Sequence, residues 1–366
     1  AYRRQRQMCI RDSVRSYRRK IIKVGVRMYH GRFKNTHYQA GFHWGEMLRK
    51  HGNFIHKQHT FQITEERKKF AMRCLPVYEK YYPEVLKEIK GIADGQQSSY
   101  EDLCTFLLSM YCFEFSNHCT CFAFRDQEHI VFGRNSDFLT ELEKLYMNCL
   151  YHLDGGYSFQ GNTTAFVQME DGVNEYGLAV GLTFVYPKVH KAGLNAGMLV
   201  RYVLEKCRTT KEAIDFLQEI PIASQQILTV VDVFGDMAVV ECNPYEVEVI
   251  LPKDGEEFVV TANNYNSEKL SAYKNSEEVD DWNSSERYKV AYQALKAQNN
   301  HFSLKCAEEI LSGKYGFMCQ YDRKTGADTV WSVIYDVKER KIYRVEGNPV
   351  RKGFKEDKRF HFRCIG

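Results

Sequence analysis

The sequence predicts an α+β fold in which antiparallel sheets and helices form separate layers. Helical periodicity dominates up to residue 118, and strand-like runs dominate from Cys119 onward. These runs are interrupted by one helical block at residues 198–217 instead of alternating with helices, which excludes a βαβ architecture. A chain of 366 residues, of which 44% are apolar, can bury a full core.

Residues 24–118 are expected to be largely helical. Thr64-Glu65-Glu66 opens an amphipathic stretch, because a capping residue is followed by acids and by apolar residues at helical spacing. A second start lies before the apolar run at 103–115, where either Ser98-x-x-Glu101 or Ser99-x-x-Asp102 fits a capping box. That run predicts a buried helix.

The pattern changes to strands at Cys119. Residues 119–124 and 129–134 flank a polar turn and predict a β-hairpin. Helices are also expected at 286–297 and 303–311, and the two halves of the block at 198–217 form two more. The other expected strands are residues 164–169, 177–184, 227–233, 237–242, 248–251 and 258–261, with a late hairpin at 330–336 and 341–345.

Charge and composition exclude several classes of protein. The net charge of +4 is misleading, because residues 1–20 hold eight Lys/Arg against one Asp and leave the remainder at −3. We therefore expect no nucleic-acid partner. No apolar run is long enough for a membrane span. Residues 1–20 look like translated sequencing adapter, with a native basic arm as the alternative, and are left out of the fold.

The twelve cysteines are scattered and mostly lie in apolar runs. They are expected to be reduced core thiols in a cytoplasmic protein, because disulfide frameworks are typical of short secreted chains. There is no CxxC pair, so we expect no metal site, and no cofactor is implied.

Four polar clusters are candidates for chemistry. Cys119 begins a strand, and a thiol becomes a nucleophile when a base or a positive field yields the thiolate. The predicted hairpin returns Arg134 and Asp137 beside it, where an Arg lowers a thiol pKa. We expect Cys121, two residues further on, to point to the opposite face. A structural cysteine and a surface turn remain the alternative interpretations.

The other two clusters lie later in the chain. Asn263 and Asn264 follow a strand, and an Asn amide is a good donor to a developing oxyanion, although taken alone a simple turn explains them better. Arg287 sits in the first turn of a helix, where a cation is unfavourable, which suggests a carboxylate partner. A solvated helix face is the alternative.

Together these motifs resemble the choloylglycine hydrolases and the acyl-CoA:6-aminopenicillanic-acid acyltransferases. Cys-Thr-x-Phe-Ala at 119–123 is followed by Gly-Arg-Asn-x-Asp at 133–137. Further motifs follow in family order, and residues 82–103 are similar to the pro-segment of the acyltransferase branch. In order along the chain these are Gly172-Val173-Asn174-Glu175-x-Gly177-Leu178, Ala262-Asn263-Asn264-Tyr265, Ser285-Glu286-Arg287-Tyr288, Trp331-Ser332-Val333-Ile334-Tyr335-Asp336 and Glu346-Gly347-Asn348-Pro349.

The resemblance implies an N-terminal-nucleophile (Ntn) hydrolase, with an αββα four-layer sandwich at 119–366 after a mainly helical pro-segment at 21–118. It implies autocatalytic cleavage between His118 and Cys119. Asp137 is then expected to hold the new amine and Arg134 to hold Asp137 and bias the thiol. Asn263 is expected to donate to the oxyanion and Arg287 to support this network.

The chain departs from the family pattern at two positions. His118 stands where the family usually has Gly, and Ala262 separates the usual Thr from its Asn, so Asn264 remains an alternative to Asn263.

The expected activity is that of an autoprocessing cysteine amidohydrolase on a linear non-peptide amide. One alternative is an acyltransferase that takes its acyl group from a donor such as acyl-CoA, and another is a non-catalytic binding protein. The partners are thus small molecules. The substrate and the oligomeric state are left open.

Overall fold

Two β-sheets form the centre of the computed structural model, which describes residues 28–55, 63–113, 117–276 and 278–363. The larger sheet has the strand order β1-β4-β5-β6-β7-β8-β9-β10, and the smaller has the order β11-β2-β3-β12-β13-β14. Neighbouring strands are antiparallel apart from β1 and β4, which are parallel. The strands of the larger sheet are β1 (Tyr29–Asn35), β4 (Met147–Leu153), β5 (Phe159–Thr163), β6 (Asp171–Asn174), β7 (Ala179–Phe184), β8 (Gln226–Val231), β9 (Met237–Cys242) and β10 (Val247–Ile250). Those of the smaller sheet are β2 (His118–Arg125), β3 (Ile130–Leu139), β11 (Phe258–Thr261), β12 (Ala327–Asp336), β13 (Lys341–Glu346) and β14 (Lys355–Glu356).

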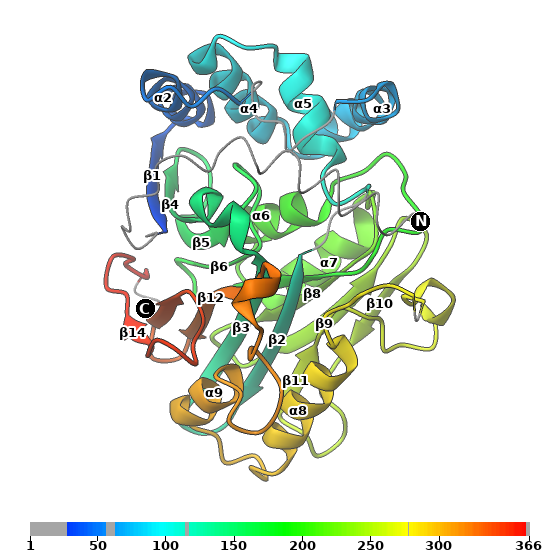
Figure 1. The fold of residues 1–366 in the computed structure, drawn as a ribbon, viewed down its shortest axis with the longest axis vertical. Helices are drawn as coiled ribbons and strands as arrows, with labels where there is room; N and C mark the ends of the chain where they lie inside the picture. The colour runs from blue at the N-terminus through cyan, green and yellow to red at the C-terminus, as the bar shows by residue number, and fades with distance from the viewer. Residues whose placement is uncertain (1–27, 56–62, 114–116, 277, 364–366) are drawn as a thin grey trace.

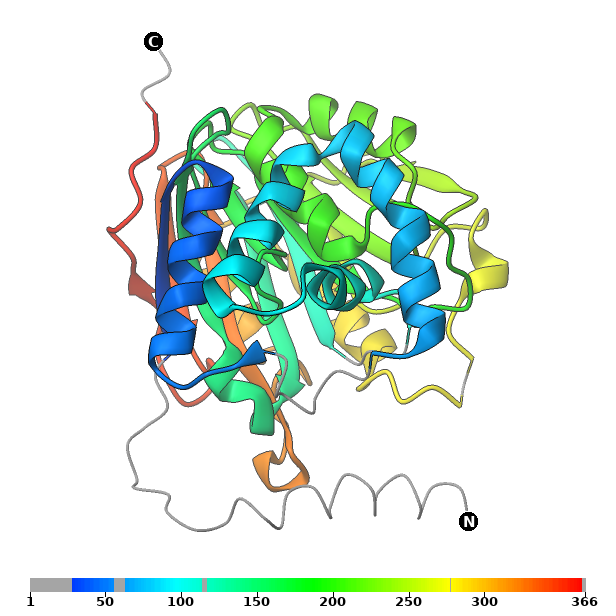
Figure 2. The same ribbon diagram turned by 90° about the horizontal axis from the view of Figure 1, so that it is seen from above.

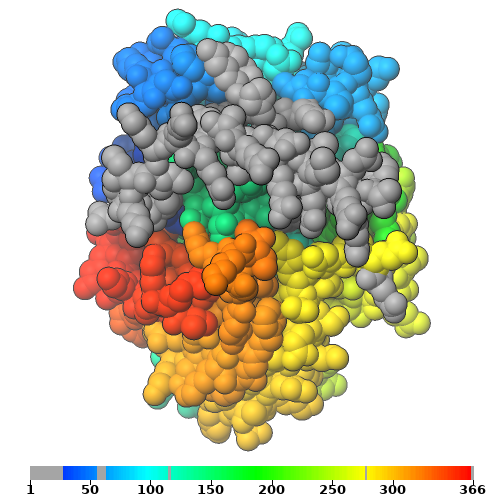
Figure 3. All heavy atoms as spheres, viewed as in Figure 1, coloured from blue at the N-terminus to red at the C-terminus, as the bar shows by residue number. Residues whose placement is uncertain are grey.

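Helices cover the outer face of each sheet, so the molecule has four layers (Figure 1). The α2–α5 layer and the region of α9 lie at opposite ends of the molecule in the space-filling view (Figure 3). The expected αββα sandwich is therefore confirmed. The helices on the larger sheet are α2 (His37–Lys50), α3 (Glu65–Tyr81), α4 (Pro83–Gln96), α5 (Tyr100–Ser109), α6 (Ala196–Lys206) and α7 (Thr210–Glu219), and those on the smaller are α8 (Ser284–Lys296) and α9 (Leu304–Leu311).

Strand β2 shows how the sequence builds these layers. Cys121 and Ala123 belong to the apolar core between the two sheets, whereas Phe122 and Phe124 pack outward with α8 and α9. Side chains on a strand alternate between its two faces, so both faces of β2 are buried. Cys119 shares the face of Cys121 and therefore points between the sheets.

The segment before Cys119 contributes both helices and a strand. Helices α2–α5 lie across the larger sheet (Figure 2), and β1 joins its edge beside β4. Thr64 caps α3, and Ser99, not Ser98, caps α5 by accepting from the Asp102 N–H at 3.1 Å. The division of the chain at residues 118 and 119 stays a prediction.

Helices α2 and α4 pack closely because glycines line their contact. A Cβ at Gly91 would lie 2.2 Å from the carbonyl oxygen of Tyr38, and one at Gly41 would lie 2.1 Å from that of Glu88. Neither helix could approach the other as closely with a side chain there. This explains the Gly91 of the pro-segment motif.

Several local predictions were wrong. Residues 164–169 form bends and turns instead of a strand, and the predicted helix at 103–115 ends at Ser109. Strands β1, β4, β5, β6 and β14 were missed. The run at 164–169 has the alternating apolar residues of a strand, and these residues pack in the core, but the backbone that carries them is irregular. Residues 1–20, the basic tail, lie outside the described residues. Within the described part of the chain, no helix is both long and apolar enough to cross a membrane.

Candidate active site

The hairpin of β2 and β3 brings Cys119 next to Arg134 and Asp137. In its register Cys119 pairs with Ser136, His118 with Asp137 and Cys121 with Arg134. All of these side chains are buried. The polar turn at 125–128 therefore does what the sequence pattern predicted, which is to fold the second strand back onto the first.

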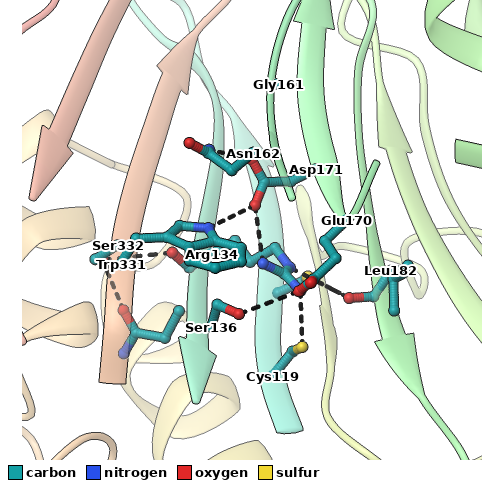
Figure 4. A network of polar contacts seen from close by, with 12 residues as sticks. Cys119, Arg134, Ser136, Gly161, Asn162, Glu170, Asp171, Leu182, Trp331 and Ser332 are labelled. Carbon is teal, nitrogen blue, oxygen red and sulfur yellow. Dashed lines mark hydrogen bonds and ion pairs between the residues drawn. The ribbon is translucent and has the colours of Figure 1, made fainter. Parts of the chain in front are cut away.

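Arg134 contacts the Cys119 thiol directly. Its Nη2 donates to the Cys119 Sγ at 2.7 Å, and its Nε donates to the Leu182 carbonyl at 3.2 Å (Figure 4). The guanidinium is fully buried. A fixed cation at this distance favours the thiolate over the thiol.

Burial opposes that effect in the uncleaved chain. It raises the pKa of the Cys119 thiol well above its usual range, while Arg134 lowers it and Glu170 raises it. With the chain continuous through Cys119, the thiol is therefore protonated. A group that accepts its proton is needed before it can attack a carbonyl.

Two acidic residues that sequence reasoning missed hold Arg134. Asp171 accepts from its Nη1 at 2.8 Å, and Glu170 lies 3.4 Å from its Nη2. Asp171 also accepts from Trp331 Nε1 at 2.9 Å and from the Tyr335 hydroxyl at 2.7 Å (Figure 4 shows the tryptophan). A signal was present, because the two acids stand immediately before the Gly172–Leu178 motif and Trp331 opens another.

Asp137 pairs with His118 in the hairpin register and is fully buried. Its carboxylate accepts from the Thr329 hydroxyl at 2.6 Å and from the Tyr321 hydroxyl at 3.0 Å, and Arg287 Nη1 is 3.7 Å away. Burial raises the pKa of Asp137 to about 6, and Arg287 opposes the rise. This carboxyl titrates close to the working range of a general base or an amine partner.

Asn263 is held against the backbone of Cys119. Its Oδ1 accepts from the Cys119 N–H at 2.9 Å and from Arg287 Nη2 at 2.8 Å. A guanidinium can only donate, so this contact fixes which amide atom is the oxygen. Its Nδ2 donates to the Phe184 carbonyl at 2.8 Å. Asn264 points elsewhere and accepts from the Asn275 N–H at 3.1 Å.

Arg287 ties these parts together from the first turn of α8. Its Nη1 donates to the Cys119 carbonyl at 2.7 Å and to the Thr120 hydroxyl at 2.8 Å. The carboxylate within ion-pair distance is Asp137, so this arginine is not on a solvated helix face. Arg287 therefore connects the amide of Asn263, the carboxylate of Asp137 and the backbone of Cys119.

His118 is buried on the other side of the candidate cleavage site. Its ring stacks on Trp282 with centroids 4.6 Å apart, and neither ring nitrogen has a hydrogen-bond partner among the described residues. Burial and the nearby Arg287 lower the pKa of His118 well below its usual value. The imidazole is therefore neutral in this structure.

The expectation that Cys121 faces away from Cys119 was wrong. Residues two apart on a strand share a face, and the Cys121 thiol lies 3.9 Å from the carbonyl of Leu182, which Arg134 also contacts. The ten cysteines that the structure describes are all buried and free of disulfides, as expected of core thiols.

Asn174 of the same family motif has a structural position. Its Nδ2 donates to the carbonyls of Leu204 and Cys207 at 3.1 and 2.7 Å, and its Oδ1 accepts from the N–H groups of Tyr176 and Leu178. These bonds join the β6–β7 turn to the end of α6.

Comparison with known proteins gives a family match and more distant structural similarities. The chain is similar to a mutant of conjugated bile acid hydrolase from Clostridium perfringens, at 14% identity over 68% of this chain and 99% of that one, with a TM-score of 0.48. It is also similar to penicillin V acylase from Agrobacterium tumefaciens, at 16% identity over 68% of this chain and 100% of that one, with a TM-score of 0.46. No curated protein sequence matches.

The family model for acyl-coenzyme A:6-aminopenicillanic acid acyl-transferases matches residues 124–351. This range includes Arg134, Asp137, Asn263 and Arg287, and it begins shortly after Cys119. Because the match spans more than half of the sequence, the chain belongs to the acyl-coenzyme A:6-aminopenicillanic acid acyl-transferase family.

Proposed function

We propose that this protein is a self-processing cysteine amidohydrolase that cleaves linear non-peptide amides through a thioester on Cys119. Family membership places it among the Ntn enzymes that hydrolyse amides or transfer acyl groups. The observation that carries the proposal is the contact between Arg134 Nη2 and the Cys119 Sγ, at 2.7 Å, next to Asp137 and Asn263.

The first step is self-cleavage. The Cys119 thiol loses its proton and its sulfur attacks the carbonyl carbon of His118. The His118–Cys119 C–N bond breaks, and the Cys119 nitrogen takes up a proton to become an amine. Water then hydrolyses the resulting thioester, which leaves a carboxylate on His118 and returns the thiol to Cys119.

Turnover repeats this chemistry on a substrate. The free α-amine titrates at about 7.7–8, so it accepts the proton of its own thiol near neutral pH. The sulfur adds to the substrate carbonyl, the C–N bond breaks, and the leaving nitrogen takes the proton from the α-ammonium. Water hydrolyses the thioester and releases the acid.

The surrounding residues fit supporting roles. Asp137 holds the α-ammonium, and Arg134 stabilises the thiolate across the 2.7 Å contact. Asn263 is the proposed oxyanion donor, for which its Nδ2 must exchange the Phe184 carbonyl for the developing negative oxygen. Arg287 orients Asn263 through its Oδ1.

Acyl transfer is the second candidate, and the family's own description favours it. The same thioester forms, with a coenzyme A thioester as acyl donor, and an amine instead of water attacks it. Trapping of the acyl-enzyme with a panel of N-acyl amines and acyl-CoAs, followed by mass spectrometry with and without an added amine, distinguishes the two reactions. The ten free cysteines support a site of action in the cytoplasm.

Self-cleavage is the first prediction, and it separates an enzyme from a binding protein with the same fold. Purified protein is expected to resolve into two pieces on a denaturing gel, the larger one beginning at Cys119. Intact mass and N-terminal sequencing check this, with Cys119→Ala as the uncleaved control. An active protein that keeps only its original N-terminus contradicts the proposal.

The two asparagines provide the second prediction. Asn263→Ala is expected to lower kcat by about 10²–10³ with little change in KM, because the lost donor acts on the transition state. Asn264→Ala is the matched control and is expected to be mild, since its side chain contacts Asn275 instead of Cys119. Steady-state kinetics of both variants test this. If Asn264→Ala loses activity while Asn263→Ala keeps it, the oxyanion donor is Asn264 and not Asn263.

A further inference from the structure

Residues Asn117 and His118 lie on the acyl side of the bond that self-cleavage breaks. If Cys119 attacks the His118 carbonyl, then His118 and the residues before it stand where a substrate places its acyl group. The contacts of these two residues therefore describe the acyl subsite of the mature enzyme. This argument rests on the proposed function.

Asn117 and His118 meet chemically different surfaces. The His118 ring lies on the face of Trp282, and Trp282 packs in turn on Tyr321 with ring centroids 5.5 Å apart. The Asn117 Nδ2 donates to Glu170 Oε2 at 3.3 Å, and both residues are buried. The subsite thus combines an aromatic wall with a carboxylate.

Glu170 is held firmly at one oxygen and loosely at the other. Its Oε1 accepts from the Thr164 hydroxyl at 2.6 Å and from the Thr164 N–H at 3.2 Å. Among the described residues, the contacts of its Oε2 are long, with Ser136 Oγ at 3.3 Å, Asn117 Nδ2 at 3.3 Å and Arg134 Nη2 at 3.4 Å. Cleavage removes Asn117 from the covalent framework, so the loosely held oxygen is the one that a ligand can reach.

The charge balance around Glu170 favours a donor. Among the described residues, Arg134 is the cation that pairs with both Glu170 and Asp171, and its closer contact is with Asp171. One buried carboxylate is thus left without a cation of its own while Cys119 is a thiol. A buried carboxylate is costly unless it is hydrogen-bonded, and a cationic donor compensates it better than a neutral one.

We propose that Glu170 sets the acyl specificity of the mature enzyme. It selects acyl groups that carry a hydrogen-bond donor, above all an ammonium, as far from the reacting carbonyl as the Asn117 amide nitrogen is from the His118 carbonyl. That distance is counted in bonds along the covalent path. The path runs from the His118 carbonyl carbon through its Cα and N, then through the Asn117 carbonyl carbon, Cα, Cβ and Cγ, to Nδ2. A 7-aminoheptanoyl group places its nitrogen at the same number of bonds from its carbonyl.

The test compares two amides with the same leaving group. The 7-aminoheptanoyl and octanoyl 4-nitroanilides differ only in an ammonium against a methyl group, and 4-nitroaniline release gives kcat/KM for each. Wild type is expected to prefer the ammonium substrate by about tenfold or more, the effect of a hydrogen bond to a charged group. Glu170→Gln is expected to remove that preference. Because Glu170 also contacts Arg134, the readout is the ratio of the two kcat/KM values and not the rate on either substrate alone.

Glu175→Gln is the matched control. Glu175 follows β6 within the same motif but pairs with Arg363 outside the site, so this variant is expected to keep the wild-type preference. Equal loss on both substrates in Glu170→Gln, or no preference in wild type, overturns the assignment of Glu170 and leaves the proposed function intact. Absence of any hydrolysis and of self-cleavage in wild type overturns both.

Self-cleavage gives a second readout that needs no substrate. Asn117→Asp places a carboxylate against Glu170 and is expected to slow cleavage about tenfold or more, because like charges repel in a buried site. Adding Glu170→Gln to this variant is expected to restore much of the rate, which a merely structural defect at residue 117 would not allow. The proposed contact is contradicted if Asn117→Asp cleaves itself at the wild-type rate, or if the double variant does not recover the rate.

Discussion

Cys119→Ala is expected to abolish self-cleavage and turnover together. Both reactions use the same sulfur in the proposed mechanism, and Cys119 is the thiol that follows the bond to be cleaved. The protein should still fold, because a cysteine at this buried position is replaced by a smaller apolar side chain. Gel analysis for cleavage and assays of amide hydrolysis on the same preparation measure both losses.

Cys121→Ala is the matched control for this experiment. The two thiols share a face of β2, but Cys121 pairs with Arg134 in register and lies in the core between the sheets. Its replacement is expected to affect stability at most. Both thiols lie near Arg134, so labelling with iodoacetamide is used to show which of them reacts. If labelling and loss of activity follow Cys121, the nucleophile has been assigned to the wrong cysteine.

Asp137→Asn is expected to lower kcat of the cleaved enzyme by roughly 10²–10⁴, the range for the loss of positioned acid–base chemistry. The variant removes the negative charge that holds the α-ammonium of Cys119 but keeps the shape of the side chain. Its loss lowers the pKa of that amine, so the acid limb of the kcat–pH profile is expected to move to lower pH. If neither the acid limb of the kcat–pH profile nor kcat changes, Asp137 does not hold the α-ammonium.

The same substitution has a stability signature in the uncleaved chain. Burial raises the pKa of Asp137 to about 6, above that of an unfolded carboxyl. The folded state therefore binds this proton more tightly, and wild type is expected to lose free energy of unfolding as the pH rises through about 6. Asp137→Asn lacks this loss. Denaturant unfolding of the two proteins in the Cys119→Ala background, which prevents cleavage, measures the difference.

A control shows whether a rate loss reflects misfolding. In Asp137→Asn the Arg287 guanidinium keeps its other acceptors, which are Cys119 O, Thr120 Oγ1, Asn263 Oδ1, Asp281 O and Trp282 O. Asp232→Asn alters another buried carboxylate, which lies away from the site. This carboxylate accepts a hydrogen bond from the Thr210 N–H at 2.8 Å. It is expected to change stability without changing kcat.

Local patterns were sufficient for much of the secondary structure. The hairpin from Cys119 to Arg134 follows from two apolar runs around a polar turn, and the cap at Thr64 follows from the acids and apolar residues after it. For the next helix the spacing left Ser98 and Ser99 as alternatives, and the structure decided for Ser99. The closeness of Asp137 to Cys119 is a consequence of the same short hairpin. In each case the deciding interactions connect residues that are near in sequence, so the sequence carries the information directly.

The rest depended on contacts between distant segments. Strand β1 was missed because its pairing with β4 joins residues far apart. Residues 164–169 have the apolar pattern of a strand, but they reach the core from bends and turns. The choice between Asn263 and Asn264 required knowing which side chain meets the Cys119 N–H. Glu170 and Asp171 were not among the candidate residues, and the packing of the two sheets places them, buried, around Arg134.

The sequence by itself thus determined the layer class and the hairpin, which follow from periodicity and local spacing, and the candidate residues, which follow from the resemblance of their motifs to a family. The tertiary structure decided which of the two asparagines meets Cys119, which acids hold Arg134, and which groups face Asn117 and His118. Those features depend on side chains from both sheets meeting in one buried space, and no local pattern encodes their mutual distances.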